Sequence, residues 1–184
     1  MKTKSKVLLG VAVGLLVVLG ASFFASGASL QGRFIGGGSI SLSSSSPSGA
    51  RSVSSSDDFF AFDVTATSTR PTVIQAGDML QVTFRTDAND INETVSSATS
   101  AERVTLSCDG ASFGAGYIVP VDDRFAAVGV VMVNELTVAA SDTSTCSFNT
   151  STSNLLEEDS GVDDPLAVTM RYGNTLLTGN TINY

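Results

Sequence analysis

The chain has 184 residues, of which 42% are hydrophobic and 15% charged, and its net charge is −8. That length suits one domain with a targeting or anchoring segment rather than two full domains. Histidine is absent, which excludes imidazole proton transfer, Ser-His and Cys-His pairs, and His-ligated zinc or haem. All three lysines lie in the first six residues, and the remainder carries seven arginines against eighteen acids. Such an acidic surface predicts no nucleic-acid partner.

The first 28 residues form a leader. Basic residues 1–6 precede the apolar run 7–25, which as a helix would be roughly 28 Å long and close to the thickness of a bilayer core. Ser26 and Ala28 provide small residues for a cleavage after Ala28. Two interpretations stay open for residues 1–28: a cleaved signal peptide, or a single-span anchor that makes the membrane a partner through residues 7–25. Both predict export to the extracellular space or cell surface.

Residues 29–56 are dominated by serine and glycine. We expect a flexible linker, because such a composition buries too little apolar surface to offset the entropy of ordering. An alternative starts from the alternating pattern Ser39-Ile40-Ser41-Leu42. If the leader is cleaved, this segment could add as a strand to the sheet edge of a neighbouring subunit and so build a fibre.

From residue 57 onward, apolar residues recur with period two between frequent turn signals, which predicts strands rather than helices. We expect about eight strands, near residues 60–64, 80–84, 104–108, 117–121, 125–133 with 136–138, 146–148, 166–172, and a short strand close to the C-terminus. Tyr117, Val119 and Val121 are expected to share one face. The pattern predicts an all-β domain over residues 57–184, an antiparallel β-sandwich.

The segment Thr72–Phe84 contains a Gly77-Asp78 turn followed by alternating Leu80, Val82 and Phe84. In this it resembles the strand-turn-strand opening of Ig-like domains in exported prokaryotic surface proteins. The resemblance covers about thirteen residues and implies an Ig-like sandwich without implying a ligand. The chain departs from antibody-type domains in lacking a core tryptophan and in having cysteines only 38 residues apart.

The two cysteines both fall on inward positions of predicted strands. Cys108 shares a face with Leu106, and Cys146 shares one with Phe148. In an exported protein, two inward cysteines predict a disulfide; the alternative is a pair of buried free thiols. A loop of this size would stabilise the domain by roughly 4 kcal/mol.

The loop after the second predicted strand alternates oxygen-bearing side chains. Asp87, Asn89, Asp90, Asn92 and Glu93 have the ligand type that calcium prefers, and they form the candidate metal site. A second acidic cluster covers residues 157–164 and a third is Asp122-Asp123. The competing interpretation for all three is solvated loop charge. We expect no other cofactor.

These patterns together predict a non-enzymatic exported surface module with a structural or adhesive role, in a cell envelope or a membrane-containing virion. Its partners would be other surface proteins or copies of itself. The first alternative is the fibre subunit that donates residues 29–56. The second is a hydrolase that uses a pair of carboxylates. The sequence does not show which two carboxylates would pair, because only the fold would bring them together.

Overall fold

The computed structural model describes residues 35–87, 91–92, 102–156 and 165–184. The leader and the first six residues of the expected linker lie outside these ranges. Among the described residues, none belongs to a helix with the length and apolar character needed to cross a bilayer.

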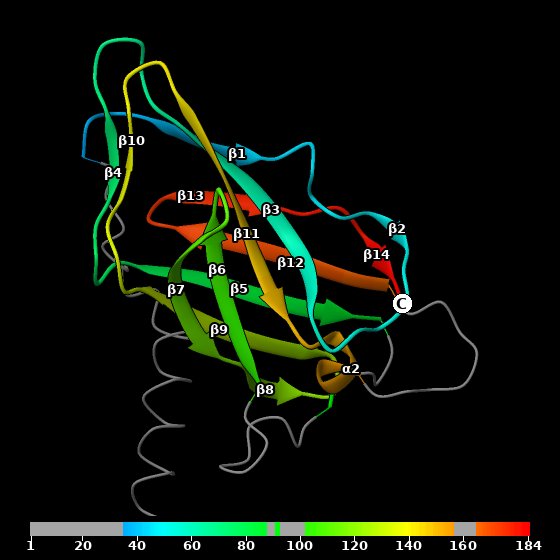
Figure 1. The fold of residues 1–184 in the computed structure, drawn as a ribbon. Helices are drawn as coiled ribbons and strands as arrows, with labels where there is room; N and C mark the ends of the chain where they lie inside the picture. Colours follow the sequence, from blue (N-terminus) through cyan, green and yellow to red (C-terminus); the bar gives the residue numbers. More distant parts are fainter. Residues whose placement is uncertain (1–34, 88–90, 93–101, 157–164) are drawn as a thin grey trace, which may run out of the picture.

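The described chain is almost entirely β-structure (Figure 1). Its first seven strands are β1 (Ser39–Leu42), β2 (Gly49–Ala50), β3 (Asp57–Thr65), β4 (Thr72–Ile74), β5 (Met79–Thr86), β6 (Arg103–Cys108) and β7 (Ala111–Tyr117). The remaining strands are β8 (Val119–Asp122), β9 (Phe125–Met132), β10 (Leu136–Val138), β11 (Thr143–Thr150), β12 (Pro165–Tyr172), β13 (Thr175–Thr178) and β14 (Ile182–Asn183). One short helix, α2 (Thr152–Leu155), follows β11.

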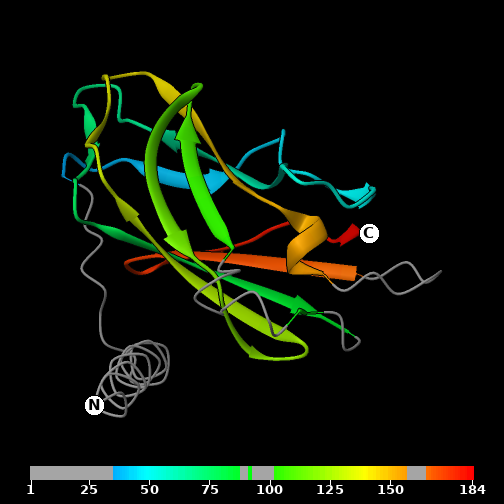
Figure 2. The ribbon, with the colours of Figure 1, turned by 60° about the horizontal axis from the view of Figure 1, so that its bottom comes forward.

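Most of the strands form one curled sheet rather than two separate ones. Its hydrogen-bonded order is β1-β3-β11-β6-β7-β9-β5-β12-β14-β2, with β13 also paired to β12 and β8 to β9, while β4 and β10 form a separate ribbon. Figures 1 and 2 show the β3-β11-β6 portion lying across from the β9-β5-β12 portion. All pairs are antiparallel except β14 with β2. The all-β prediction is confirmed, whereas the purely antiparallel two-sheet arrangement is wrong for this mixed sheet.

The core lies inside the curl and is rich in phenylalanine. Phe148 on β11 has its ring centroid 5.5 Å from that of Phe62 and 6.2 Å from that of Phe60, both on β3. Phe59 reaches across to Phe84 on β5, with ring centroids 4.9 Å apart. These side chains are fully buried. The aromatic contacts therefore join the two facing portions of the sheet, in the tilted geometries that aromatic pairs favour.

Part of the expected linker belongs to the folded domain. β1 pairs with β3 along four residues, and β2 pairs with β14. Ile40 is 8% exposed and packs in the core, while Ser46 Oγ accepts a hydrogen bond from the Ala61 backbone N–H. The expectation of a flexible linker is therefore wrong for these strands. Composition missed this because the serines satisfy backbone groups of β3 rather than burying apolar surface of their own.

The predicted strand at 117–121 is interrupted, and its faces are reversed. β7 ends at Tyr117 and β8 begins at Val119, with Ile118 between them. Tyr117 and Val121 are 61% and 59% exposed, whereas Ile118 is 1% exposed. Apolar residues occupy both parities here, so alternation alone could not choose the inward face.

Strand β7 begins six residues before the strand that the sequence predicts at 117–121. It begins at Ala111 and includes Gly114 and Gly116, which weaken a strand signal. A Cβ on Gly116 would lie 2.2 Å from the Gly129 carbonyl oxygen of β9. The glycines therefore permit close approach of β7 and β9.

Tyr172 near the end of β12 ties that strand to the turn before β5. Its hydroxyl donates to Asp78 Oδ2 at 2.6 Å, and the same oxygen accepts the Gln75 backbone N–H. Burial, followed by the hydrogen bond to and the negative charge of Asp78, raises the pKa of Tyr172 far above its ordinary value near 10. The neutral phenol is therefore the form that the folded protein favours.

We predict that Tyr172→Phe lowers the free energy of unfolding at pH 7 by about 1.5–3 kcal/mol, the range for a hydrogen bond to a charged group. A raised pKa in the folded state gives stability that is present below about pH 10 and lost at higher pH, as the unfolded tyrosine ionises. The variant should therefore lose less stability than the parent between pH 9.5 and 11.5. Urea unfolding across this range measures both effects, and Tyr117→Phe, at an exposed position, is the control. Identical pH profiles for parent and Tyr172→Phe would contradict the assignment.

Candidate functional site

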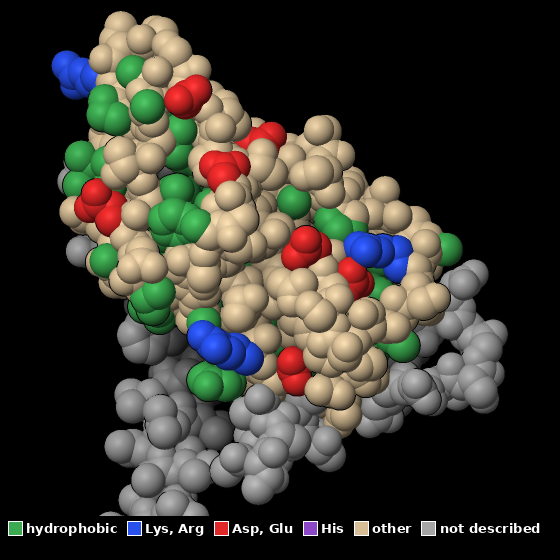
Figure 3. All heavy atoms as spheres, in the orientation of Figure 1, with side chains coloured by type: hydrophobic (Ala, Val, Ile, Leu, Met, Phe, Trp, Pro, Cys, Tyr) green, Lys and Arg blue, Asp and Glu red, His purple; other side chains and the backbone are tan. Residues whose placement is uncertain are grey.

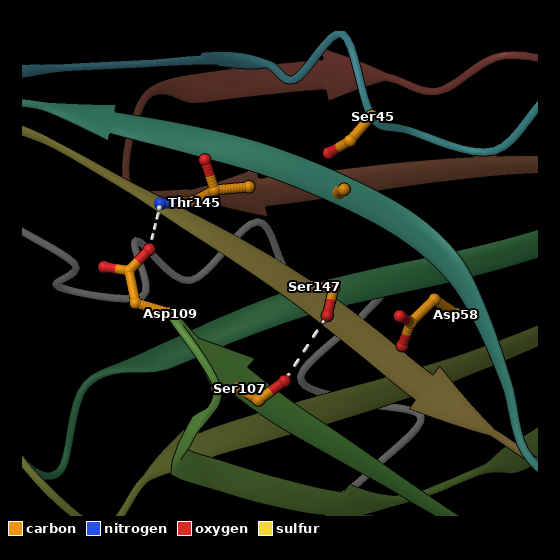
Figure 4. A pocket seen from close by; sticks show the side chains of 8 residues that line it. Ser45, Asp58, Ser107, Asp109, Thr145 and Ser147 are labelled. Carbon is orange, nitrogen blue, oxygen red and sulfur yellow. Dashed lines mark hydrogen bonds between the residues drawn. The ribbon is translucent and has the colours of Figure 1, made fainter.

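The outer face of β3, β11 and β6 carries a hollow of about 310 Å³. It is lined by Ser45, Asp58, Ala61, Ser107, Asp109, Gly110, Thr145 and Ser147. Figure 4 shows these side chains coming from the β1–β2 loop, from all three strands and from the β6–β7 turn. On β11, Thr145 and Ser147 line the hollow because Cys146 between them points into the core. On β3, a bulge places both Phe59 and Phe60 in the core between Asp58 and Ala61.

Hydrogen bonds between neighbouring strands connect much of the polar face around the hollow. Ser107 and Ser147 share a bond of 3.3 Å between their hydroxyls. Asn149 donates from Nδ2 to Asp58 Oδ1 at 3.1 Å and accepts from Ser56 Oγ at 3.0 Å. The face is thus held by bonds among its own side chains.

Asp109 owes its position to a tight hairpin. Asp109 and Gly110 connect β6 to β7 with φ values of 49° and 81°, as a two-residue turn with two left-handed residues requires. The Asp109 carboxylate accepts the Thr145 backbone N–H through Oδ1 and the Ser144 hydroxyl through Oδ2, at 3.1 and 2.6 Å. Its backbone N–H also donates to the Thr145 carbonyl. Asp109 therefore fastens the turn to β11.

The chemistry of the hollow is that of an anionic, hydroxyl-rich surface. Among the residues that the structure describes, its lining contains two carboxylates and no cationic side chain. On the face drawn in Figure 3, charged side chains are spread out rather than gathered into one patch. Sequence reasoning missed this hollow: the Asp109-Gly110 dipeptide signals a turn, but the placement of β3 beside β11 and β6 depends on pairing between distant segments.

The candidate calcium ligands are only partly described. Asn89, Asp90 and Glu93 lie outside the described residues, as does the cluster at 157–164. Asp87 is exposed at the end of β5. Asn92 is held by its backbone N–H, which donates to the Leu155 carbonyl of α2, and the neighbouring Ile91 N–H donates to the Asp123 carbonyl. Within the described ranges, no three Asp, Glu or Cys side chains are grouped closely enough to hold a metal ion.

Calcium binding by the 87–93 loop stays a prediction. If it binds, calcium should raise the midpoint of thermal unfolding relative to chelator-treated protein, because a ligand that binds only the folded state stabilises it. The Asp87→Asn/Asp90→Asn variant should lose most of this shift, whereas Asp142→Asn, far from the loop in sequence, should keep it. Differential scanning calorimetry with calcium or with EDTA measures the shift. Equal midpoints in both conditions would count against the site.

The disulfide joins Cys108 of β6 to Cys146 of β11, and the two residues lie directly opposite each other in the sheet. Both are buried. The bond therefore links neighbouring strands beneath the Ser107–Ser147 pair of the hollow. It differs from the disulfide between opposed sheets in antibody-type domains.

The fold and the disulfide define the class of the chain as an all-β, disulfide-stabilised domain. No family model matches it, and no curated protein does. Solved structures that are similar in part include the following two. The RrgB pilus protein from Streptococcus pneumoniae is 14% identical with a TM-score of 0.32, over 71% of this chain and 20% of that chain. The collagen-binding subdomain ACE19 of the Enterococcus faecalis surface protein ACE is 10% identical with a TM-score of 0.29, over 67% of this chain and 88% of that chain.

Proposed function

We propose that this chain is a non-enzymatic module displayed outside the cytoplasm, with a structural or adhesive role at a cell envelope or the surface of a membrane-containing virion. The observation that carries the proposal is the buried disulfide between β6 and β11. Disulfides persist in oxidising compartments and are rare in the cytosol. The basic and apolar leader of residues 1–28 agrees with export.

The polar face supports a binding role over a catalytic one. Both carboxylate oxygens of Asp109 accept hydrogen bonds from β11, and Asp58 accepts one from Asn149. These contacts hold the strands together, whereas a hydrolase needs one carboxyl group that donates a proton and another that attacks or activates water.

Exposure of the native protein to an added protease tests the display proposal. Intact cells or particles that carry the chain should lose the 57–184 domain to external protease, while a cytoplasmic marker survives. The protein isolated without reductant should give no reactive thiols after denaturation and two after reduction. A domain protected in intact cells, with both thiols free, would overturn the proposal. An intact mass then separates the two forms of the leader, since cleavage after Ala28 removes the anchor.

A second candidate is a self-assembling fibre subunit that donates residues 29–56. The observation in its favour is that β1, within that range, already occupies a strand position at one end of the sheet. In a fibre, that position would be filled by the neighbouring subunit. Native protein that stays monomeric at every concentration would exclude this candidate and leave the display proposal standing.

A further inference from the structure

Residues 39–51, which we call the clasp segment, connect the two ends of the curled sheet. Its β1 pairs with β3 at one end, and its β2 pairs with β14 at the other. Between them, the Ser46 carbonyl accepts a hydrogen bond from Asn180 Nδ2. Figure 1 shows the segment running from β1 across to β2, beside the C-terminal strand. The clasp segment thus covers edges of the sheet that would otherwise offer unpaired backbone groups.

The two halves of the clasp segment are held very differently. The β2 half is fixed by Arg51, whose backbone N–H donates to the Asn183 carbonyl at 2.7 Å. The guanidinium of Arg51 also forms an ion pair with the buried Asp57 at 2.8 Å and donates to the Asp58 carbonyl. Tyr184 adds a hydrogen bond of 2.6 Å from its hydroxyl to Asp57. This half is therefore locked to the C-terminal end of the domain.

The β1 half is held mainly by backbone pairing: β1 pairs with β3, and just before it Ile35 exchanges two backbone hydrogen bonds with Val73 of β4. Its side chains add few contacts. Ile40 is its one buried apolar residue, and Leu42 is partly buried against the core. The other two residues, Ser39 and Ser41, are exposed. Full burial of one aliphatic side chain contributes only about 1.5–3 kcal/mol. The partner strand is far more strongly anchored, because Phe62 and Val64 of β3, opposite Leu42 and Ile40, are completely buried.

Residues 43–48 between the two halves have the character of a hinge. They read Ser-Ser-Ser-Ser-Pro-Ser and carry no large apolar side chain. Their closest contacts with β3 are two hydrogen bonds to Ala61, from the Ser43 N–H to its carbonyl and from its N–H to Ser46 Oγ. Fully extended, six residues reach about 20 Å. That length allows β1 to leave its own β3 edge while β2 stays paired with β14.

We propose that β1 exchanges between copies of this chain, so that β1 of one copy pairs with β3 of another while β2 stays bound to its own domain. The exchanged segment includes Ile35, which pairs with Val73 of β4 just before β1. If both pairings form in the other copy, the contacts equal those of the closed monomer, and only the hinge conformation and the entropy of association differ. Reciprocal exchange gives dimers, and exchange in one direction gives linear chains. The inference supplies the mechanism for the fibre candidate and does not bear on display.

Cysteine trapping at one register pair tests the exchange. Ser41 and Asp63 are directly opposite on β1 and β3, so their Cβ atoms are near enough for a disulfide. The full chain, in mild detergent, is prepared as Ser41→Cys and as Asp63→Cys with tags of different mass. The two are mixed at high concentration and oxidised. Exchange predicts a disulfide-linked heterodimer, on non-reducing gels, at least five times more abundant than from a control mixture of Ser41→Cys and Thr137→Cys.

The double variant Ser41→Cys/Asp63→Cys carries both cysteines on one chain, so it forms an intramolecular disulfide in the closed monomer and an intermolecular one after exchange. Exchange predicts linked multimers whose fraction rises with protein concentration. Only intramolecular bonds at every concentration, together with a heterodimer yield equal to the control mixture, would overturn the proposal. The native cysteines do not interfere, because they are buried and already paired.

Shortening the hinge gives an independent measurement. Deleting Ser44 and Ser45 leaves too little chain for β1 to return easily to its own β3, a change that favours exchange in hinge loops. Light scattering should then show dimers or larger species at concentrations where the parent is monomeric. A monomeric deletion variant with unchanged thermal stability would contradict the proposal. Either failure leaves the protease and thiol results on display unaffected.

Discussion

Replacing Cys108 and Cys146 together with alanine is expected to lower the free energy of unfolding by about 4 kcal/mol. The bond closes a loop with a sequence separation of 38 residues, and its removal frees the unfolded chain from that constraint. Since domains of this size are stable by only about 5–15 kcal/mol, the variant should be close to unfolding at 37 °C. Urea unfolding of the oxidised parent and the variant measures the difference.

The neighbouring serine pair provides a matched control. Ser107 and Ser147 lie opposite each other on the same two strands, one position before Cys108 and one after Cys146, and share only a hydrogen bond. Ser107→Ala/Ser147→Ala should therefore cost less than about 1 kcal/mol, because the hydroxyls lie on the partly solvated outer face. Similar losses for the serine and cysteine variants would show that the stabilisation comes from strand pairing in general rather than from the disulfide.

Phe148→Ala should cost about 3–5 kcal/mol, the range for truncating a buried phenylalanine. Its ring lies among those of Phe59, Phe60 and Phe62, within 6.2 Å between centroids in each case. Truncation leaves a cavity between β11 and β3 that these rings cannot fill without leaving their own contacts. Chemical denaturation measures the loss in the oxidised protein.

Leu176→Ala is the control for Phe148→Ala. Leu176 lies on β13 and is 64% exposed, so its truncation should change stability by less than about 0.5 kcal/mol. A loss below 1.5 kcal/mol for Phe148→Ala would mean that the aromatic cluster is not the centre of the core.

The alternation of apolar and polar residues correctly predicted the strands that bury only one face. On β12, alternate side chains point into the core of the domain, as their spacing indicated: Leu166, Val168, Met170 and Tyr172. The parity of Cys108 and Cys146 predicted their burial and their bond for the same reason. Prediction failed around Tyr117 and Ile118, where apolar residues occupy both faces and alternation no longer distinguishes inside from outside.

The hollow and the clasp segment could not be predicted in this way. Asp58 and Asp109 line the same hollow because β11 lies between β3 and β6, an order that no local pattern encodes. β1 is held by one buried isoleucine and by backbone pairing, so its composition resembles that of a linker. Both features depend on which strands become neighbours in the sheet and on which strand edges remain unpaired for β1 and β2 to bind.

The sequence by itself determined the all-β class, the inward face of most strands, the disulfide, and the acidic, histidine-free chemistry of the chain. These follow from side-chain period and composition, which act locally. Only the tertiary structure decided that the strands form one curled, mixed sheet, that the serine-rich segment closes it, and that polar residues from distant strands share one hollow. Those outcomes depend on backbone hydrogen bonding between distant segments, in which every residue type can take part, proline as an acceptor only.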